Sequence, residues 1–165
     1  MKKLKTIVYL SLGSNLGRRS ANLRRAIRLI GQQVGEVTAV SDFLATEPWG
    51  FTSEHSFLNA CVRVLTSLTP RQLLEVTQQI ERQMGRRKAP SNLPPLGAAF
   101  SPTHPEQGRK VYHDRIIDID ILLYGDLRVD EPDLQIPHPL MHQRQFVMQP
   151  LRQICPDEPQ TLNNP

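Results

Sequence analysis

Two aspartates separated by a single isoleucine, Asp118 and Asp120, are the residues of this chain best suited to chemistry. They lie in the run 115–124, whose isoleucines and leucines predict a buried β-strand. Side chains two positions apart in a strand share a face, so both carboxylates should project side by side. The opposite face should carry Ile117, Ile119, Ile121 and Leu123. Two adjacent anions on an apolar strand repel each other and lose hydration, which predicts a bound cation, and oxygen ligands of this kind suit Mg²⁺.

The alternative interpretation is that each aspartate faces solvent or pairs with an arginine. Two groups of basic residues favour the metal. One lies just upstream of the pair (Arg109, Lys110, Arg115) and the other spans the end of a predicted helix (Arg82, Arg86, Arg87, Lys88). Fixed cations beside paired carboxylates fit a metal–polyphosphate complex, in which arginine and lysine bind the oxygens that the metal leaves.

Composition bounds the class of protein. A chain of 165 residues with 39% hydrophobic residues is long and apolar enough for one folded domain, which excludes a disordered chain. A net charge of +4 fits an anionic ligand but does not choose between a nucleotide, a nucleic acid and a membrane. Cys61 and Cys155 form no metal or redox motif and are expected to be reduced thiols. Reduced thiols predict a cytoplasmic protein. We expect no signal peptide and no membrane span.

Hydrophobic periodicity predicts elements in the order β-α-β-β-α-β. The strands are expected at 6–12, 36–43, 57–66 and 116–124, and the helices at 20–33 and from 70 to about 84. Thr69, Pro70 and Gln72 form a capping-box start for the second helix. Residues 44–56 are expected to form a loop, Gly125-Asp126 a tight hairpin turn into residues 127–129, and residues 143–154 to include a short helix. The order predicts a ferredoxin-like α+β sandwich, a mainly antiparallel sheet with helices packed on it, extended by a hairpin and a C-terminal helix.

One domain is expected over residues 1–157, followed by a frayed tail at 158–165. Within it, residues 89–110 contain five prolines and no sustained apolar period. A loop this long inside a compact domain is either a functional lid over the active site or a tolerated insertion. The arginines of the first helix (Arg18, Arg19, Arg24, Arg25, Arg28) are expected to be mostly solvated.

Several motifs in a fixed order suggest a family. They are Gly13-Ser-Asn-Leu-Gly17, Phe57-Leu-Asn59, Gly85-Arg-Arg-Lys88, Arg115-Ile-Ile-Asp-Ile-Asp-Ile-Leu122, Ile136-Pro-His-Pro139, and Arg144 with Phe146. Each is weak alone, but the ordered set, from about Thr6 to Asp157, resembles the 6-hydroxymethyl-7,8-dihydropterin pyrophosphokinase family of folate biosynthesis. The resemblance implies an enzyme, a diphosphotransferase that moves a diphosphate from ATP to the pterin hydroxymethyl group and leaves AMP.

The resemblance also implies roles for individual residues. Asp118 and Asp120 are similar to the ligands of two Mg²⁺ ions, and Arg86 and Arg115 to cations that accompany the transferring diphosphate. Catalysis would then consist mainly of positioning and charge stabilisation, with no nucleophilic serine or cysteine. The alternative for Arg86 and Arg87 is a solvated helix end favoured by the helix dipole.

The implied pterin site consists of aromatic and polar residues from distant segments. Phe57 and Phe146 would stack on the ring, with Asn59 on its edge. Thr46, Pro48, Trp49 and Asp118 would complete the site. From composition alone, Phe57 and Phe146 are more simply ordinary core aromatics.

For ATP, the resemblance implies Gln78, Glu81, Lys88, Tyr112, Arg115, Ile121, His138 and Arg144. Two of these depart from the family pattern. Lys88 replaces a frequent arginine, which keeps the charge but loses the bidentate fork, and Tyr112 stands where a tryptophan is common. His138 taken alone is more often a structural loop histidine.

Two other classes compete with a pyrophosphokinase. An RNA-binding module shares the strand order and basic charge, but paired aspartates on a central strand would repel a phosphate backbone. A regulatory ligand-binding domain would not need paired acids together with two basic groups. We therefore expect small-molecule substrates, no nucleic acid or membrane partner, and a monomer.

Overall fold

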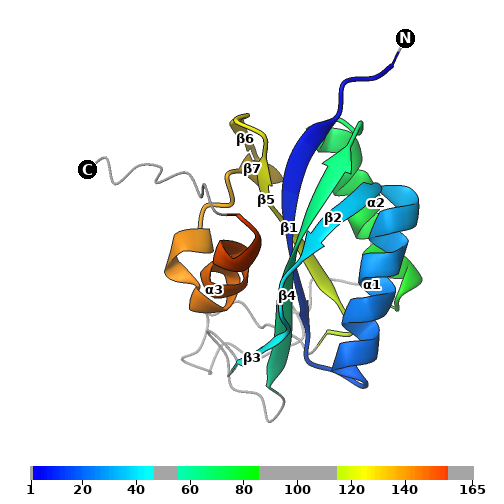
Figure 1. Cartoon of the computed structure of the whole chain (residues 1–165), viewed down its shortest axis with the longest axis vertical. Coiled ribbons are helices and arrows are strands. Elements are labelled where there is room, and N and C mark those ends of the chain that lie inside the picture. The colour runs from blue at the N-terminus through cyan, green and yellow to red at the C-terminus, as the bar shows by residue number, and fades with distance from the viewer. Residues whose placement is uncertain (1, 47–55, 86–114, 156–165) are drawn as a thin grey trace, which may run out of the picture.

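A computed structural model of the chain describes residues 2–46, 56–85 and 115–155 (Figure 1). The elements, in chain order, are β1 (Thr6–Ser14), α1 (Arg19–Gln33), β2 (Gly35–Val40), β3 (Leu44–Thr46), β4 (Phe57–Thr66), α2 (Pro70–Gln83), β5 (Asp118–Tyr124), β6 (Val129–Glu131), β7 (Leu134–Ile136), a 3-10 turn (Met141–Gln143) and α3 (Gln145–Ile154). The capping box predicted for α2 is present, with Thr69 and Gln72 each bonded to the other's backbone N–H.

The main sheet is antiparallel, with the strand order β2-β4-β1-β5 and β3 paired to β4. Strand β4 therefore lies between β1 and β2, which are joined through α1. This is the split β-α-β arrangement, and it confirms the predicted ferredoxin-like sandwich. Strand β5, which carries both aspartates, lies at the open edge of the sheet.

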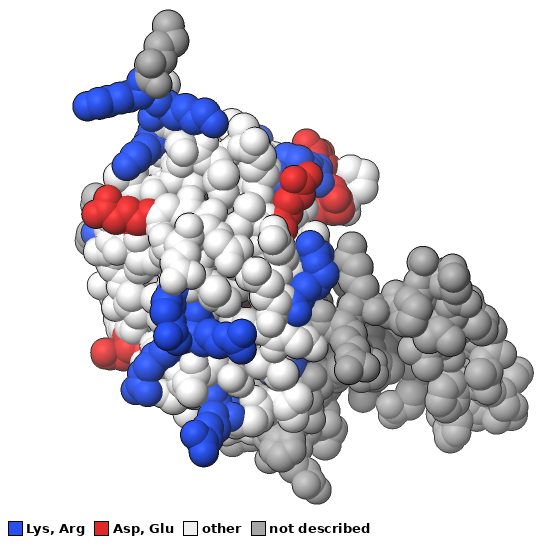
Figure 2. All heavy atoms as spheres, turned by 90° about the vertical axis from the view of Figure 1, so that its right-hand side faces the viewer, with Lys and Arg blue, Asp and Glu red and all other residues white. Residues whose placement is uncertain are grey.

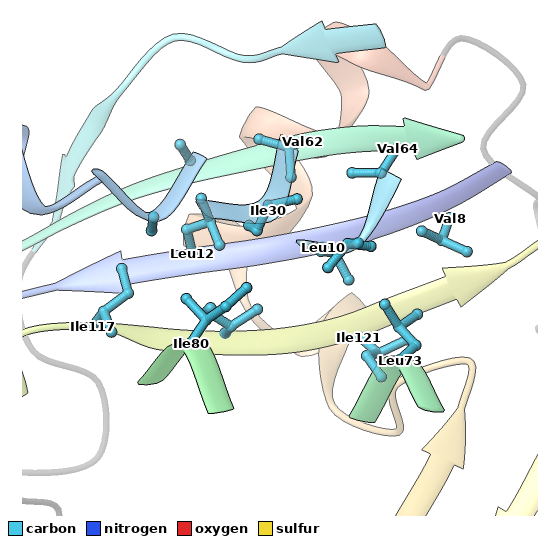
Figure 3. Close-up of a cluster of buried hydrophobic side chains, with 14 of the residues drawn as sticks. Val8, Leu10, Leu12, Ile30, Val62, Val64, Leu73, Ile80, Ile117 and Ile121 are labelled. Atoms are coloured by element: carbon cyan, nitrogen blue, oxygen red, sulfur yellow. The ribbon is translucent and has the colours of Figure 1, made fainter. Parts of the chain in front are cut away.

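Helices cover both faces of this sheet. Figure 1 shows α1 and α2 on one side and α3 on the other. Side chains from α1, α2 and the sheet form the first core cluster, which includes Leu10, Ile30 and Ile80 (Figure 3). A second, smaller cluster lies under α3 and includes Cys61, Leu122 and Leu151.

A β-bulge in β5 changes which side chains reach which cluster. Tyr9 pairs with Leu123 and Leu10 with Ile121, so Leu122 is an extra residue between two ladder positions. Leu122 and Leu123 both join the cluster under α3. The prediction that Leu123 shares a face with the strand isoleucines is therefore wrong, although Ile117, Ile119 and Ile121 do share the first cluster.

Residues 44–46 form strand β3, and their assignment to a loop was wrong. Strand β4 has 10 residues, whereas β2 has 6 and pairs only with its C-terminal half. Strand β3 pairs with Phe57 to Asn59 instead. Ser41 links the two stretches, since its N–H donates to the Cys61 carbonyl and its Oγ accepts from the Cys61 N–H, both at 2.9 Å.

The hairpin predicted after β5 also needs correction. Gly125 does make the turn, with φ of 49° and its N–H bonded to the Ile7 carbonyl at 2.8 Å. The chain then leaves the sheet, and β6 pairs with β7 rather than returning along β5. Arg71 of α2 contacts Glu131 and Asp133 of this small hairpin.

The outer side of the helical layer is basic. Eight lysines and arginines and no acidic residue precede Glu36. Figure 2 shows Lys and Arg side chains gathered over the side on which α1 lies, and Arg18, Arg24, Arg25 and Arg28 are exposed as predicted. Arg19 is half-buried and differs from them. No helix in the described ranges is long and apolar enough to cross a membrane.

Candidate active site

The floor of the candidate site is the α3-facing side of strands β4, β1 and β5. Asn59, Gly13 and Asp118 lie opposite one another across the three strands. Cys61, Ser11 and Asp120 form the next row. Directly opposed residues of an antiparallel sheet share a face, so the paired acids and Asn59 belong to one surface.

Gly13 lies between Asp118 and Asn59 in this row and is itself buried. A Cβ atom at Gly13 would lie 3.1 Å from Asn59 Oδ1 and 3.6 Å from Phe57 Cδ1. Because glycine has no side chain, Asn59 and Phe57 can pack closely over strand β1 at this point. The motif 13–17 contains this glycine, but its role depends on a strand pairing that the motif does not reveal.

Asp118 is held by an arginine. Arg115 Nη1 donates to Asp118 Oδ1 at 3.0 Å, and the two side chains are 28% and 30% exposed. The alternative of an aspartate paired with arginine is thus realised at Asp118. It does not exclude a metal, because both groups remain accessible and a carboxylate has further lone pairs.

The donor set fits Mg²⁺ bound together with a ligand. Among the residues that the structure describes, no group of three or more His, Cys, Asp or Glu side chains could hold a metal alone. Mg²⁺ commonly takes only one or two carboxylates and completes its octahedron with water and substrate phosphates. Two half-buried carboxylates beside an arginine match that requirement.

Three of the pterin-side residues predicted from sequence, Thr46, Phe57 and Asn59, come together at one end of the sheet. Asn59 is 3% exposed, and its Nδ2 donates to Thr46 Oγ1 at 2.7 Å. Phe57 is half-buried, and its ring lies beside Gly13. Phe146, at the start of α3, is half-buried against the second cluster, with the Arg144 guanidinium 5.7 Å from its ring centre. Neither phenylalanine is a fully buried core residue.

His138 is positioned by backbone contacts. Its N–H donates to the Leu122 carbonyl at 3.0 Å, and its Nδ1 accepts the Leu140 N–H at 3.2 Å. Burial and then the charge of Arg144 lower the pKa of His138, against an opposing effect of Asp118. The imidazole is therefore neutral near pH 7, and with Nδ1 accepting, its proton lies on Nε2 as a donor.

Three predicted nucleotide residues are not on this surface. Gln78 is exposed and Glu81 is 3% exposed, both on α2, which packs on the other side of the sheet. The Ile121 side chain belongs to the first core cluster (Figure 3). Strand β5 lies at the edge of the sheet, so a residue of α2 can contact a ligand on the α3 side only by reaching around that edge. Ile121, whose side chain lies in the core, can contact such a ligand only through its main-chain atoms.

Several predicted residues lie outside the described ranges. They are Pro48, Trp49, Arg86, Lys88 and Tyr112, together with Arg87, the 89–110 segment and the 158–165 tail. Their roles remain predictions.

The fold and this surface define a class: a ferredoxin-like α+β domain that presents paired carboxylates, an arginine and a polar, aromatic-rimmed floor at one edge. Residues 9–156 match the model of the 7,8-dihydro-6-hydroxymethylpterin-pyrophosphokinase family, and the chain belongs to this family.

Curated proteins with similar sequences carry names that match this family. The chain is 46% identical over 151 residues to a 2-amino-4-hydroxy-6-hydroxymethyldihydropteridine pyrophosphokinase of Porphyromonas gingivalis, covering 91% of each chain. It is 37% identical over 153 residues to the Bacillus subtilis protein of that name, covering 92% of this chain and 80% of the relative. A Plasmodium falciparum HPPK-DHPS crystal structure superposes with a TM-score of 0.68 at 17% identity, over 97% of this chain but 42% of that one, and shows the likeness in fold.

Proposed function

We propose that this protein is a diphosphotransferase of folate biosynthesis that moves the β,γ-diphosphate of ATP onto the hydroxymethyl group of 6-hydroxymethyl-7,8-dihydropterin and releases AMP. Membership of the family supports the reaction. The observation that carries the assignment of the site is the row in which Asp118 lies across Gly13 from Asn59, with Arg115 bonded to the acid.

The reaction needs one substitution at phosphorus. The hydroxymethyl oxygen attacks the β-phosphorus and loses its proton, while the bond from that phosphorus to the α,β-bridging oxygen breaks and AMP departs. Asp118 and Asp120 would hold Mg²⁺, two ions in our proposal, and the bound metal would neutralise phosphate charge and activate the hydroxyl. Arg115 orients Asp118 and adds positive charge beside the transferring group, as Arg86 is proposed to do.

The pterin edge would be recognised at Asn59. Its Nδ2 donates to Thr46 Oγ1, and its Oδ1 lies on the side of Gly13. An acceptor in that position suits the N–H groups of the pterin amino-pyrimidine ring. Phe57 and Phe146 would stack on the ring, with Pro48 and Trp49 completing the pocket.

The nucleotide would be bound by Arg144, by the Nε2–H of His138, and by Lys88 and Tyr112. Gln78, Glu81 and the main chain of Ile121 would contact it around the β5 edge. We further propose that the protein acts as a cytoplasmic monomer; its free, buried cysteines suit a reducing compartment.

The direct test combines the protein with ATP, Mg²⁺ and the hydroxymethyl-dihydropterin and separates the nucleotides formed. AMP is the expected product in amounts equal to the pterin diphosphate. Formation of ADP instead would identify an ordinary kinase and contradict the proposal.

Asp118→Asn and Asp120→Asn should each lower kcat by at least about a thousandfold, roughly 4 kcal/mol, because each removes a charged metal ligand of nearly identical shape. Asp126→Asn, at an exposed turn position of the same charge, is the control and should keep full activity. Circular dichroism checks that all three fold. Wild-type turnover in both site variants at ordinary Mg²⁺ concentrations would remove the acids from the mechanism.

A further inference from the structure

The turn between β1 and α1, residues 14–19, contacts two distant points that border the candidate site. One is Arg115, just before β5, and the other is Ser56, just before β4. We propose that Asn15 and Arg19 are positioning residues that align the two substrates separately, Asn15 on the Mg²⁺–nucleotide side and Arg19 on the pterin side. This inference rests on the proposed function and concerns residues that touch neither substrate.

Asn15 holds the main chain of Arg115 with two hydrogen bonds. Its side chain is buried, with the residue 2% exposed, and Oδ1 accepts the Arg115 N–H at 2.6 Å. Its own N–H donates to the Arg115 carbonyl at 3.1 Å. The two residues are 100 positions apart in sequence, so this pair of bonds sets where the chain enters β5.

The position of the Arg115 backbone also affects the proposed metal site. The Arg115 side chain donates to Asp118 Oδ1, so the backbone that Asn15 holds also carries the partner of a proposed metal ligand. Loss of the Asn15 acceptor frees the Arg115 backbone to shift, and the carboxylate loses a fixed partner. The effect should therefore appear in Mg²⁺–ATP binding.

Arg19 holds the chain segment just before β4, on the proposed pterin side of the site. Its Nη1 donates to the Ser56 carbonyl at 2.7 Å and to Ser56 Oγ at 2.6 Å. Ser56 directly precedes Phe57, whose ring borders the floor at Gly13. A charged donor with two acceptors makes a strong contact, and it explains why Arg19 is half-buried while Arg18 and Arg24 are exposed.

The turn itself is held independently. Gly17 has φ of 69°, and Asn22 Nδ2 donates to the Leu16 carbonyl at 2.8 Å and to Ser14 Oγ at 3.2 Å. Asn22 thus ties the turn to α1 through contacts with neither Arg115 nor Ser56. It provides a matched control for general loosening of the turn.

The experiment compares Asn15→Ala and Arg19→Ala with the controls Asn22→Ala and Arg24→Ala. Steady-state kinetics give kcat and the KM of each substrate. Calorimetry with Mg²⁺ and α,β-methylene-ATP, which cannot transfer its diphosphate, gives nucleotide affinity without turnover. Fluorescence titration with 6-hydroxymethylpterin gives pterin affinity.

We expect a crossed pattern. Asn15→Ala should weaken Mg²⁺–nucleotide binding about tenfold and pterin binding less than twofold, as loss of a buried hydrogen bond implies. Arg19→Ala should do the reverse, and Arg19→Lys, which keeps a cationic donor, should recover part of the loss. Both controls should stay within about twofold of wild type. Asn15→Ser and Arg19→Lys should show the same crossed pattern at about threefold, and they decide the matter if an alanine variant does not fold.

Two results overturn the inference. One is that Asn15 and Arg19 variants weaken both substrates equally, as a purely structural role would do. The other is that they match the Asn22→Ala control. Asp118→Asn, measured in parallel, separates this failure from failure of the site: an inactive Asp118→Asn with an unchanged Asn15→Ala removes only the positioning role, whereas an active Asp118→Asn removes the proposed site itself.

Discussion

At the scale of single residues, Asp118 combines two environments that are usually considered as alternatives. It is paired with Arg115, yet about a third of its side chain stays accessible. A pair this exposed contributes little to stability. We propose that its value lies in orientation, because the arginine fixes one oxygen of a carboxylate that is proposed to bind a metal.

Cys61 carries a thiol that could act as a nucleophile, but its surroundings make it unreactive. It is fully buried, and that burial raises its pKa to about 12. The thiol is therefore neutral at physiological pH and supplies no nucleophile. This agrees with a direct transfer of the diphosphate.

The stacking role of Phe146 can be tested by Phe146→Ala. Removing a partly exposed aromatic from one side of a flat ring should weaken 6-hydroxymethylpterin binding about tenfold to a hundredfold and leave α,β-methylene-ATP binding within about twofold. Fluorescence titration measures the first and calorimetry the second. Phe43→Ala is the control, since Phe43 is also half-buried but packs on the first core cluster. Equal pterin affinity in wild type and Phe146→Ala would make Phe146 an ordinary packing residue.

At the scale of elements, the bulge in β5 allows one strand both to present the aspartates and to pack against α3. Up to Ile121 the strand alternates, with isoleucines facing α1 and α2 and the aspartates facing α3. The extra residue Leu122 then lets two consecutive leucines enter the cluster under α3. The strand can thus present acids at one end and support α3 at the other.

The close approach of α1–β2 to β4 depends on Gly35. A Cβ atom there would lie 2.3 Å from the Leu65 carbonyl oxygen, a backbone atom that cannot move aside cheaply. Gly35→Ala should lower the free energy of unfolding by at least about 2 kcal/mol, as measured by urea denaturation. Gly31→Ala is the matched control, because its Cβ would meet Val37 Cγ2 at an ordinary 3.8 Å. Gly31 lies in the last turn of α1, where alanine should stabilise by at most about 0.5–1 kcal/mol, and similar effects of the two substitutions would contradict the packing argument.

At the scale of the whole molecule, the core and the site share the sheet but use different faces. The first cluster stabilises the fold between the sheet and helices α1 and α2, whereas the acids, Asn59 and Gly13 lie on the α3 face. Ligands on that face should therefore stabilise the protein by mass action without rearranging the main core.

This arrangement predicts a metal-dependent thermal shift. With Mg²⁺ and α,β-methylene-ATP at about 100 times the dissociation constant, the added stability is about 2.7 kcal/mol, or a rise in Tm of roughly 5–11 °C. EDTA should abolish most of the rise, and Asp118→Asn should respond to the nucleotide alike with and without Mg²⁺. Differential scanning fluorimetry provides the measurement. A shift of the wild type that persists in full with EDTA would show that nucleotide binding does not need the metal.

Local sequence patterns were sufficient to predict many of the helices and strands of this protein. The alternation of residues 57–66 predicted β4 over its full length, and Thr69, Pro70 and Gln72 predicted the start of α2. The ordered motifs predicted the family, because they preserve residue types that the chemistry requires. Such signals are readable since periodicity and caps involve neighbours only a few positions apart.

Long-range pairing decided the rest. The strand at 44–46, the bulge at Leu122 and the separate β6–β7 hairpin depend on partners elsewhere in the sheet, so local propensity could not predict them. The same holds for Gly13, which lets Asn59 and Phe57 pack closely over β1, and for Asn15 and Arg19, whose partners lie 100 and 37 positions away. The sequence by itself determined which chemical groups this protein has and the elements that bear them, whereas only the tertiary structure decided which of those groups meet, because hydrogen bonds across the sheet join segments that no local pattern relates.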